Sequence, residues 1–273
     1  MRKFNFTKMV ASGNDFILIL KENLSALRIP LSILAKSICE RRFGIGADGI
    51  LVLAKSKVAN IKMRIFNADG SEAQMCGNGA RCVALYTKEH FFPNSSKITI
   101  ETKAGIIKSE IKKDLVKIKL TDPKNIKLNL PLKVNGRLIR VNFINTGVPH
   151  TVIFTQGLEK IDVKTIGRAI RYHQKFKPAG TNVDFVEVLK TDLIKIRTYE
   201  RGVEDETLAC GTGAVASALI TNYRLLIKNC RCIYVKTYSG EVLKVYFERK
   251  ENTFKNVWLE GKAKIIYKGE YYV

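Results

Sequence analysis

The sequence contains one five-residue pattern twice, as Cys76-Gly77-Asn78-Gly79-Ala80 and as Cys210-Gly211-Thr212-Gly213-Ala214. In each copy a cysteine precedes a glycine-bracketed turn and then a segment with helical character. The copies stand close to half of the 273-residue chain apart, which predicts a duplicated fold whose halves each bring one thiol to a shared site. Two thiols on opposite sides of a carbon can remove a proton from one face and return one to the other. The pattern therefore favours a racemase or epimerase.

Length and composition predict two ordinary domains with real cores, since 46% of the residues are hydrophobic and 26% are charged. No apolar stretch approaches the eighteen or so residues that a membrane helix needs. The N-terminal residues enter an alternating strand pattern directly, without a signal-peptide core. We therefore expect a cytoplasmic protein with no membrane partner.

The net charge of +22 raises the possibility of nucleic-acid binding. The basic residues are scattered along predicted strands, however, as in Lys112-Lys113 and Lys117 to Lys119, and they form no compact arginine-rich helix. Charge of this kind affects solubility and nonspecific association more than it defines a site. We expect no nucleic-acid partner, and a basic nucleic-acid-binding protein remains the alternative from a different functional class.

The six cysteines match no zinc-binding spacing. Cys230 and Cys232 could hold a metal in principle, but no second pair of ligands is evident, so we expect no metal. Cys39 and Cys82 fall on predicted helix faces and are expected in the core. Reduced thiols are expected throughout, because a chain of this length without a signal sequence needs no disulfides.

Strands and helices are expected in a similar succession in the two halves. The first half predicts strands at 3–9, 16–20, 50–53, 61–66, 98–102, 105–111 and 116–120, and helices at 31–42 and 79–90. The second predicts strands at 138–145, 151–155, 183–188, 193–199, 232–238, 241–248, 257–260 and 263–267, and helices at 162–173 and 213–227. The Lys/Asn-rich stretch from Thr121-Asp122-Pro123 to Pro131 is the predicted linker. Each half thus predicts many strands around one principal helix that begins just after its cysteine.

The two cysteine turns suit acid/base chemistry. A helix N-terminus lowers the pKa of a thiol, and glycines let backbone N–H groups approach an anion closely. One turn can therefore stabilise a thiolate while it also holds a substrate carboxylate. Because two adjacent thiolates would repel each other, we expect one proton shared between Cys76 and Cys210 at rest.

Polar residues at the ends of other predicted strands suit an amino-acid head group. Asparagine amides can donate to a carboxylate and accept from an ammonium group. Arg201 can clamp a carboxylate through two hydrogen bonds, and Glu200 can pair with an ammonium. The remaining candidates are Asn14, Asn67, His150 and Asn182.

Four blocks together resemble the diaminopimelate epimerase family, in the family's order and across nearly the whole chain. They are Lys8–Phe16, Gly44–Gly49, Phe66–Cys82 and Glu200–Ala214. The resemblance implies a cofactor-independent isomerase that converts LL- to meso-2,6-diaminopimelate in lysine and peptidoglycan precursor biosynthesis. It also implies an α+β fold with two pseudo-symmetric domains, each a β-barrel-like sheet around a central helix, and a homodimer. Residues 1–121 would form the N-terminal half, 122–262 the C-terminal half, and 263–273 would return to the first.

The resemblance also implies roles for single residues. Cys76 and Cys210 would be the acid/base pair, with His150 and Glu200 assisting nearby. The substrate would be bound by Asn14, Asn67, Gly77, Asn78, Asn182, Glu200, Arg201, Gly211 and Thr212. Many family members carry Asn where this chain has Val148. The nearest rival is a proline or hydroxyproline racemase of the same fold, but its substrate has one head group and would not need this polar set.

Overall fold

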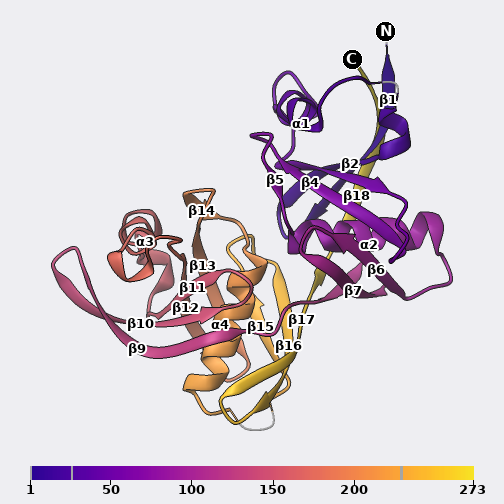
Figure 1. The fold of residues 1–273 in the computed structure, drawn as a ribbon. Coiled ribbons are helices and arrows are strands. Elements are labelled where there is room, and N and C mark those ends of the chain that lie inside the picture. Colours follow the sequence, from indigo (N-terminus) through magenta and orange to yellow (C-terminus); the bar gives the residue numbers. More distant parts are fainter. Residues whose placement is uncertain (1, 26, 228–229) are drawn as a thin grey trace. The chain divides into compact units, whose positions relative to one another are not determined.

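The computed structural model describes residues 2–25, 27–227 and 230–273. These form two compact units (Figure 1). The first comprises the chain up to Ile118 together with Gly261–Val273, and the second comprises Lys119–Glu260. No helix in the described part of the chain is long and apolar enough to cross a membrane.

In the first unit, strands from both ends of the chain form one continuous sheet. Its order is β18 (Lys264–Tyr272), β1 (Lys3–Ala11), β2 (Asn14–Leu20), β3 (Gly49–Ala54), β4 (Ile61–Asn67), β6 (Lys97–Thr102), β7 (Gly105–Lys112) and β8 (Leu115–Lys119), with β5 (Glu72–Ala73) also on β4. The pairs β2–β3 and β4–β6 are parallel and the others antiparallel. Pairing of β1 with β18 places the two termini side by side (Figure 1).

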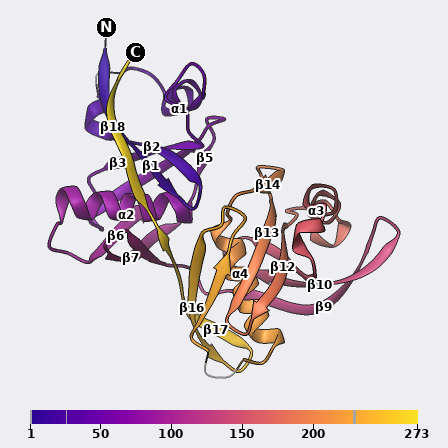
Figure 2. The same ribbon diagram turned by 180° about the vertical axis from the view of Figure 1, so that it is seen from behind.

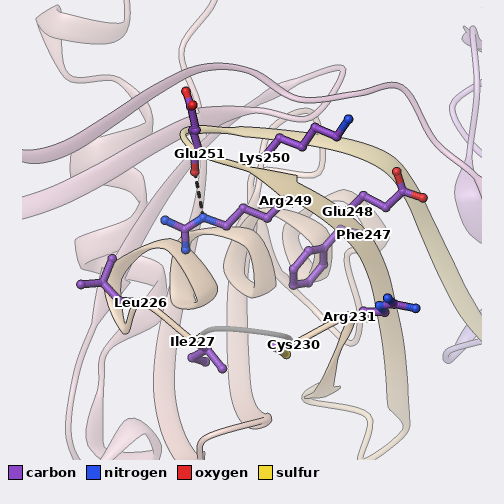
Figure 3. Close-up of a pocket in the computed structure, with 9 residues that line it drawn as sticks. All are labelled: Leu226, Ile227, Cys230, Arg231, Phe247, Glu248, Arg249, Lys250 and Glu251. Carbon is purple, nitrogen blue, oxygen red and sulfur yellow. Dashed lines mark hydrogen bonds between the residues drawn. The ribbon is translucent and has the colours of Figure 1, made fainter.

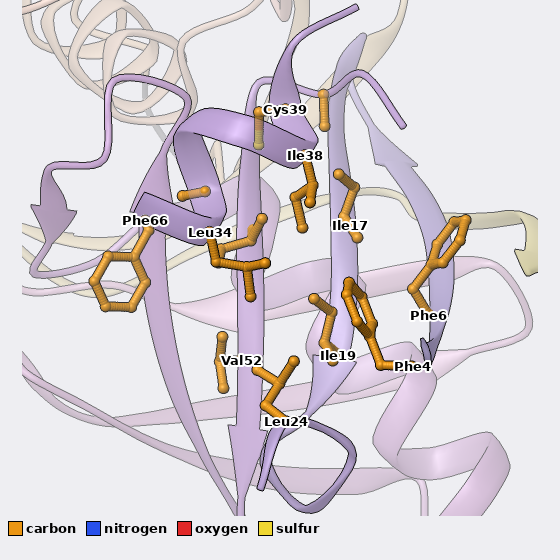
Figure 4. Packing of buried hydrophobic residues seen from close by; sticks show 13 residues of the cluster. Phe4, Phe6, Ile17, Ile19, Leu24, Leu34, Ile38, Cys39, Val52 and Phe66 are labelled. Atoms are coloured by element: carbon orange, nitrogen blue, oxygen red, sulfur yellow. The ribbon is translucent and has the colours of Figure 1, made fainter. Parts of the chain in front are cut away.

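The apolar run in β3 is buried on both faces. Ile50 and Val52 pack into a cluster with Leu34 and Ile38 of helix α1 (Leu31–Cys39). Figure 4 labels Val52, Leu34 and Ile38 in this cluster. On the opposite face, Leu51 lies against the first turn of helix α2 (Gly77–Phe91). Because successive strand residues point to opposite faces, a continuous apolar run is what a strand between two helices requires.

The second unit repeats the strand order and directions of the first. The order is β9 (Lys124–Val134), β10 (Arg137–Asn145), β11 (Pro149–Phe154), β12 (Asn182–Lys190), β13 (Leu193–Glu200), β15 (Cys232–Lys236), β16 (Val242–Lys250) and β17 (Thr253–Lys262), with β14 (Asp205–Thr207) also on β13. Here β11–β12 and β13–β15 are the parallel pairs. Helix α3 (Val163–Arg171) lies between β11 and β12 in the chain, as α1 lies between β2 and β3.

Each sheet wraps around one central helix. Helix α2 contacts β1, β2, β4, β6, β7 and β18, and helix α4 (Gly211–Arg224) contacts β10, β11, β12, β13, β15 and β16. Ten consecutive residues are buried in each helix, 78–87 in α2 and 213–222 in α4. Figure 2 shows α2 and α4 each among the strands of its own unit. A helix buried on all sides is enclosed rather than laid on a surface. The predicted α+β fold, with strands around one principal helix per half, is confirmed.

Short 3₁₀ helices complete the described secondary structure at η1 (Lys21–Leu24), η2 (Leu158–Lys160) and η3 (Gln174–Phe176). Helix α3 begins as predicted, because the Asp162 carboxylate accepts a hydrogen bond from the Thr165 backbone N–H at 3.0 Å. Such caps satisfy one of the free N–H groups of a helix start.

The predicted linker is wrong, because its residues form β9, which pairs along its length with β10. The segment alternates between exposed polar residues and partly buried Ile126, Leu128 and Leu130, which is the pattern of a strand with one covered face. Asn125 and Asn129 adopt positive φ, a conformation that asparagine tolerates. The Lys/Asn composition obscured this alternation.

Candidate active site

Each repeated cysteine is the N-cap residue of a central helix. Cys76 has φ −140° and ψ 123°, and Cys210 has φ −112° and ψ 112°, so both are extended residues immediately before a helix. The predicted glycine-bracketed turns are therefore the first helical turns themselves, and α2 and α4 begin two residues earlier than expected. First-turn N–H groups have no acceptor within the helix. Each cysteine consequently lies at a ready anion-binding position.

Around Cys76, the polar contacts hold the thiol against an oriented amide. The Gly79 N–H donates to Cys76 Sγ at 3.4 Å, and the thiol lies 4.0 Å from Asn14 Oδ1. The Asn14 side-chain N–H₂ donates to Asp48 Oδ2 at 2.5 Å. Because a carboxylate only accepts, this contact fixes which end of the amide faces the thiol. The Asn14 oxygen is therefore turned towards Cys76.

Asn14 is held by Asp48, which belongs to a network of ion pairs. Asp15 lies 2.8 Å from Lys8 Nζ and 2.9 Å from an Arg41 nitrogen, which also lies 2.8 Å from Asp48. Burial alone would raise the pKa of Asp15, but hydrogen bonds and charge from Arg41 and Lys8 outweigh it and lower that pKa to about 2. Asp15 is therefore ionised across the neutral pH range.

Two other predicted residues of the first unit make contacts within their own segments. Asn67 donates its side-chain N–H₂ to Ser71 Oγ at 2.9 Å. Asn78 is buried, and its side-chain oxygen accepts from Arg81 at 2.5 Å. The backbone N–H of Asn78 lies in the first turn of α2, where an anion at the helix start can accept from it. Asn67 stands at the end of β4 with its amide exposed.

Cys210 is buried, unlike the half-buried Cys76. Burial raises the pKa of the Cys210 thiol well above its ordinary value, and the Glu200 and Asp184 carboxylates add to that effect. The Thr212 hydroxyl, 3.5 Å from Sγ, and the Gly213 N–H oppose it. The net result favours the protonated thiol at Cys210.

His150 is fully buried and joins Thr212 to an aspartate. Its Nδ1 lies 2.7 Å from Asp184 Oδ2, and its Nε2 lies 3.0 Å from Thr212 Oγ1. The Thr198 hydroxyl donates to the other Asp184 oxygen at 2.8 Å. The predicted residue His150 is thus brought to the second cysteine through Thr212.

The remaining predicted residues of the second unit gather at the carboxyl end of β13 and the start of β12. The Asn182 N–H₂ donates to the Pro149 carbonyl at 3.0 Å, while its oxygen accepts from the Arg201 backbone N–H at 2.8 Å. The Arg201 guanidinium donates to the Ala179 carbonyl at 3.2 Å. Burial raises the pKa of Glu200, whose carboxylate accepts from Thr207 at 2.9 Å.

Sequence reasoning missed two acidic residues that orient site groups, Asp48 and Asp184. Asp48 belongs to the glycine-rich segment before β3 and was not singled out. Asp184 stands within the otherwise apolar run Val183–Val186 of β12. An acidic residue inside a buried strand was the available signal, because a buried carboxylate needs partners.

Two of the other cysteines lie in the hydrophobic core. Cys39 and Cys82 are buried, as predicted, and burial raises the pKa of Cys39 to about 12. Among the described residues, no group of three or more His, Cys, Asp or Glu could hold a metal ion.

A cavity of about 840 Å³ near the C-terminal end of α4 contains none of the predicted site residues (Figure 3). It is lined by Leu226, Ile227, Cys230, Arg231, Phe247, Glu248, Arg249, Lys250 and Glu251.

Comparison with known proteins identifies the family. A model of the family described as diaminopimelate epimerase matches residues 6–126 and 142–266. The chain belongs to the diaminopimelate epimerase family. A diaminopimelate epimerase of Aquifex aeolicus is 40% identical over 274 residues, covering 97% of this chain and 96% of the relative. One from Methanocella arvoryzae is 42% identical and covers 99% of this chain and 97% of the relative.

Solved structures share the fold at much lower identity. A phenazine biosynthesis protein of Bacillus anthracis superposes with a TM-score of 0.76 at 16% identity, covering 100% of both chains. A hydroxyproline epimerase from Agrobacterium vitis gives a TM-score of 0.68 at 16% identity, covering 99% of this chain and 91% of the other. These similarities establish the fold alone. The family membership favours the epimerase over the proline racemase alternative.

Proposed function

We propose that this protein converts LL- to meso-2,6-diaminopimelate, with Cys76 and Cys210 as the acid/base pair and without cofactor or metal. Family membership across nearly the whole chain carries the choice of substrate and reaction. The single structural observation that supports the mechanism is that both cysteines cap equivalent central helices. The scheme requires the two thiols to reach opposite faces of one α-carbon.

The two thiols differ in a way that suits opposite roles at rest. Burial and nearby carboxylates favour the protonated form of Cys210. A proton shared between the pair then stays on Cys210, and Cys76 provides the thiolate at the start of α2. When Cys76 removes the α-proton, Cys210 donates its own proton to the other face, and the reverse reaction exchanges these roles.

The reacting carboxylate is proposed to bind at the helix starts, through backbone amides of Gly77, Asn78, Gly211 and Thr212. Negative charge moves onto this carboxylate as the α-proton leaves. Helix N-termini and free amides placed there stabilise the added negative charge of the transition state more than the singly charged carboxylate of the ground state. This stabilisation replaces the electron sink that a cofactor would supply.

Amides, one cation and one anion are proposed to recognise the amino-acid groups of the substrate. Arg201 binds carboxylate, and Glu200 pairs with ammonium, while His150 assists at Cys210. The amides of Asn14, Asn67 and Asn182 complete the set. A substrate with one head group would leave some of these groups unpaired, which is a strong basis for rejecting proline.

We further propose the domain halves, the oligomeric state, the location and the pathway from the family to which the chain belongs. Residues 1–121 with 263–273 form one epimerase half, and 122–262 form the other. The enzyme acts as a homodimer in the cytoplasm, in lysine and peptidoglycan precursor synthesis. Size-exclusion chromatography with light scattering tests the dimer.

Replacing either Cys76 or Cys210 with alanine tests the two-base scheme. Each variant should lose epimerisation of LL-diaminopimelate, measured by chromatographic separation of the isomers, because one face of the α-carbon then lacks its acid or base. Cys82→Ala, which removes a buried thiol elsewhere in α2, serves as the control for thiol loss. Substantial epimerisation by either active-site variant would contradict the scheme, and activity on proline instead would reassign the substrate.

A further inference from the structure

A line of hydrogen bonds leads from Cys210 to a buried carboxylate. Cys210 Sγ lies 3.5 Å from Thr212 Oγ1, which lies 3.0 Å from His150 Nε2, and His150 Nδ1 lies 2.7 Å from Asp184 Oδ2. His150 and Asp184 are completely buried. Solvent therefore does not compete for these contacts, and their geometry is set by the surrounding strands and the start of α4.

The carboxylate sets the tautomer of His150 and the direction of the two hydrogen bonds that His150 makes in this line. An ionised Asp184 only accepts, so His150 carries its proton on Nδ1, and Nε2 of the neutral ring is an acceptor. Thr212 must then donate its hydroxyl hydrogen to Nε2. The Thr212 oxygen is left with lone pairs that can accept from the Cys210 thiol, and the Glu200 carboxylate is the other group that hydrogen-bonds this thiol.

The packing of Asp184 favours this single arrangement. Its second oxygen accepts from the Thr198 hydroxyl at 2.8 Å. The Gly213 backbone passes so close that a Cβ there would lie 2.3 Å from Asp184 Oδ1. A glycine at this position lets the first turn of α4, which carries Thr212, approach the aspartate.

We propose that Asp184 is a positioning residue and Thr212 a proton carrier for Cys210, a role that rests on the proposed epimerase function. Apart from its proton transfer with the substrate, Cys210 exchanges its proton along this line: the thiol proton passes to the Thr212 oxygen while the Thr212 hydroxyl proton passes to His150 Nε2. The products are a thiolate and an imidazolium, the latter stabilised by Asp184. Return of both protons along the same line restores the Cys210 acid.

Cys76 has a different partner, which makes the proposal specific to one thiol. Its neighbour is the Asn14 amide oxygen, held by Asp48. A carboxamide has no exchangeable acid/base form near neutral pH and carries no proton onwards. Disruption of the line should therefore act on Cys210 directly, and on Cys76 only through the proton that the two thiols share.

Thr212→Val and Thr212→Ser form the matched pair for the first test. Valine keeps the shape of threonine and removes the hydroxyl, whereas serine keeps the hydroxyl. The readout is the rate of iodoacetamide modification of each cysteine against pH, by mass mapping. We expect the Cys210 profile of Thr212→Val to move to higher pH by about one unit or more relative to Thr212→Ser, and to move further than the Cys76 profile. Coincident Cys210 profiles in the two variants would overturn the proposal.

Asp184→Asn tests the positioning role. With the asparagine oxygen held by Thr198, its N–H₂ faces His150 and reverses the tautomer, as known for asparagine in place of an orienting aspartate. We expect kcat/KM to fall about 10²-fold, within the usual range for acid/base groups. Asp184→Asn combined with Thr198→Val frees the amide to rotate and should recover part of that loss. Unchanged kcat/KM in Asp184→Asn would refute the role of Asp184.

The two experiments separate failure of this inference from failure of the proposed function. Modification of Cys210 needs no turnover, so its pH profile reports the line of hydrogen bonds even if LL-diaminopimelate is not the substrate. Wild-type activity on LL-diaminopimelate tests the function independently. An active wild type with coincident threonine-variant profiles would keep the function and reject the inference.

Discussion

Gly213→Ala places a methyl group where Asp184 already lies. The added Cβ would be 2.3 Å from Asp184 Oδ1 and 3.2 Å from its Cγ, both closer than normal contacts allow. Asp184 cannot turn aside freely, because it is buried and bonded to His150 and Thr198. The first turn of α4 and the carboxylate must therefore separate, and the bonds to His150 weaken.

Three contributions determine how much Gly213→Ala lowers the unfolding free energy. Overpacking costs about 1–3 kcal/mol, and weakened bonds to a buried charge add about 1–2 kcal/mol. Alanine returns about 1 kcal/mol through its higher helix propensity. We expect a net loss of about 1–4 kcal/mol in unfolding free energy, with a fall in kcat/KM because Cys210 and Thr212 move with the helix.

Urea unfolding measures this loss through far-UV circular dichroism and through the fluorescence of Trp258. That residue is the single tryptophan of the chain and lies in β17, within the same unit as Gly213. Gly77→Ala is the matched stability control, since its Cβ would meet nothing closer than Ile118 at 3.5 Å. It should leave stability unchanged or raise it by up to about 1 kcal/mol, through the same helix propensity. Equal stability of Gly213→Ala and wild type would refute the packing argument.

Two further predictions concern the first unit. The pKa of Asp15 is lowered to about 2 from 3.8, so ionised Asp15 stabilises the fold above about pH 4, and this contribution disappears as the pH falls through about 2. Asp15→Asn should therefore be less stable than wild type at pH 7 by about 2 kcal/mol, with the difference vanishing near pH 2 in urea titrations; a difference independent of pH would contradict this. Arg81→Met should cost about 3 kcal/mol, because Arg81 is fully buried and donates to Asn78, Ser12 and the Lys262 carbonyl, whose acceptors would be left unpaired. The exposed Arg42→Met is its control. Equal thermal stability of the two variants would contradict a stabilising role for the hydrogen bonds of Arg81.

The central helices could be predicted from sequence because several local signals agree there. A small first turn and a long apolar run after Cys76 and after Cys210 each specify a buried helix, and Asp162 specifies a cap. β9 was missed because lysines, asparagines and Pro131 outweighed the period-two alternation that its leucines carry. Alternation was the better guide, since it reports which face the fold covers.

The site was predictable in its residue types and not in its contacts. The register of the parallel pair β11–β12 sets His150 opposite Asn182, and only that register brings His150 to Asp184 two residues further on. Register depends on distant strands and turns, so local sequence does not reveal it. The same reason explains why Asp48 was not recognised as the partner of Asn14.

The most direct test of the two-base account is proton NMR of LL-diaminopimelate with the reduced protein in D₂O and no added cofactor. If two thiols act, the meso product carries deuterium at the inverted carbon from the first turnovers, while unreacted LL substrate keeps its α-proton. This follows because one thiol removes the proton and a different thiol, exchanged with solvent, supplies the deuteron. Deuterium entering the LL substrate as fast as meso product forms would indicate a single base and contradict the account.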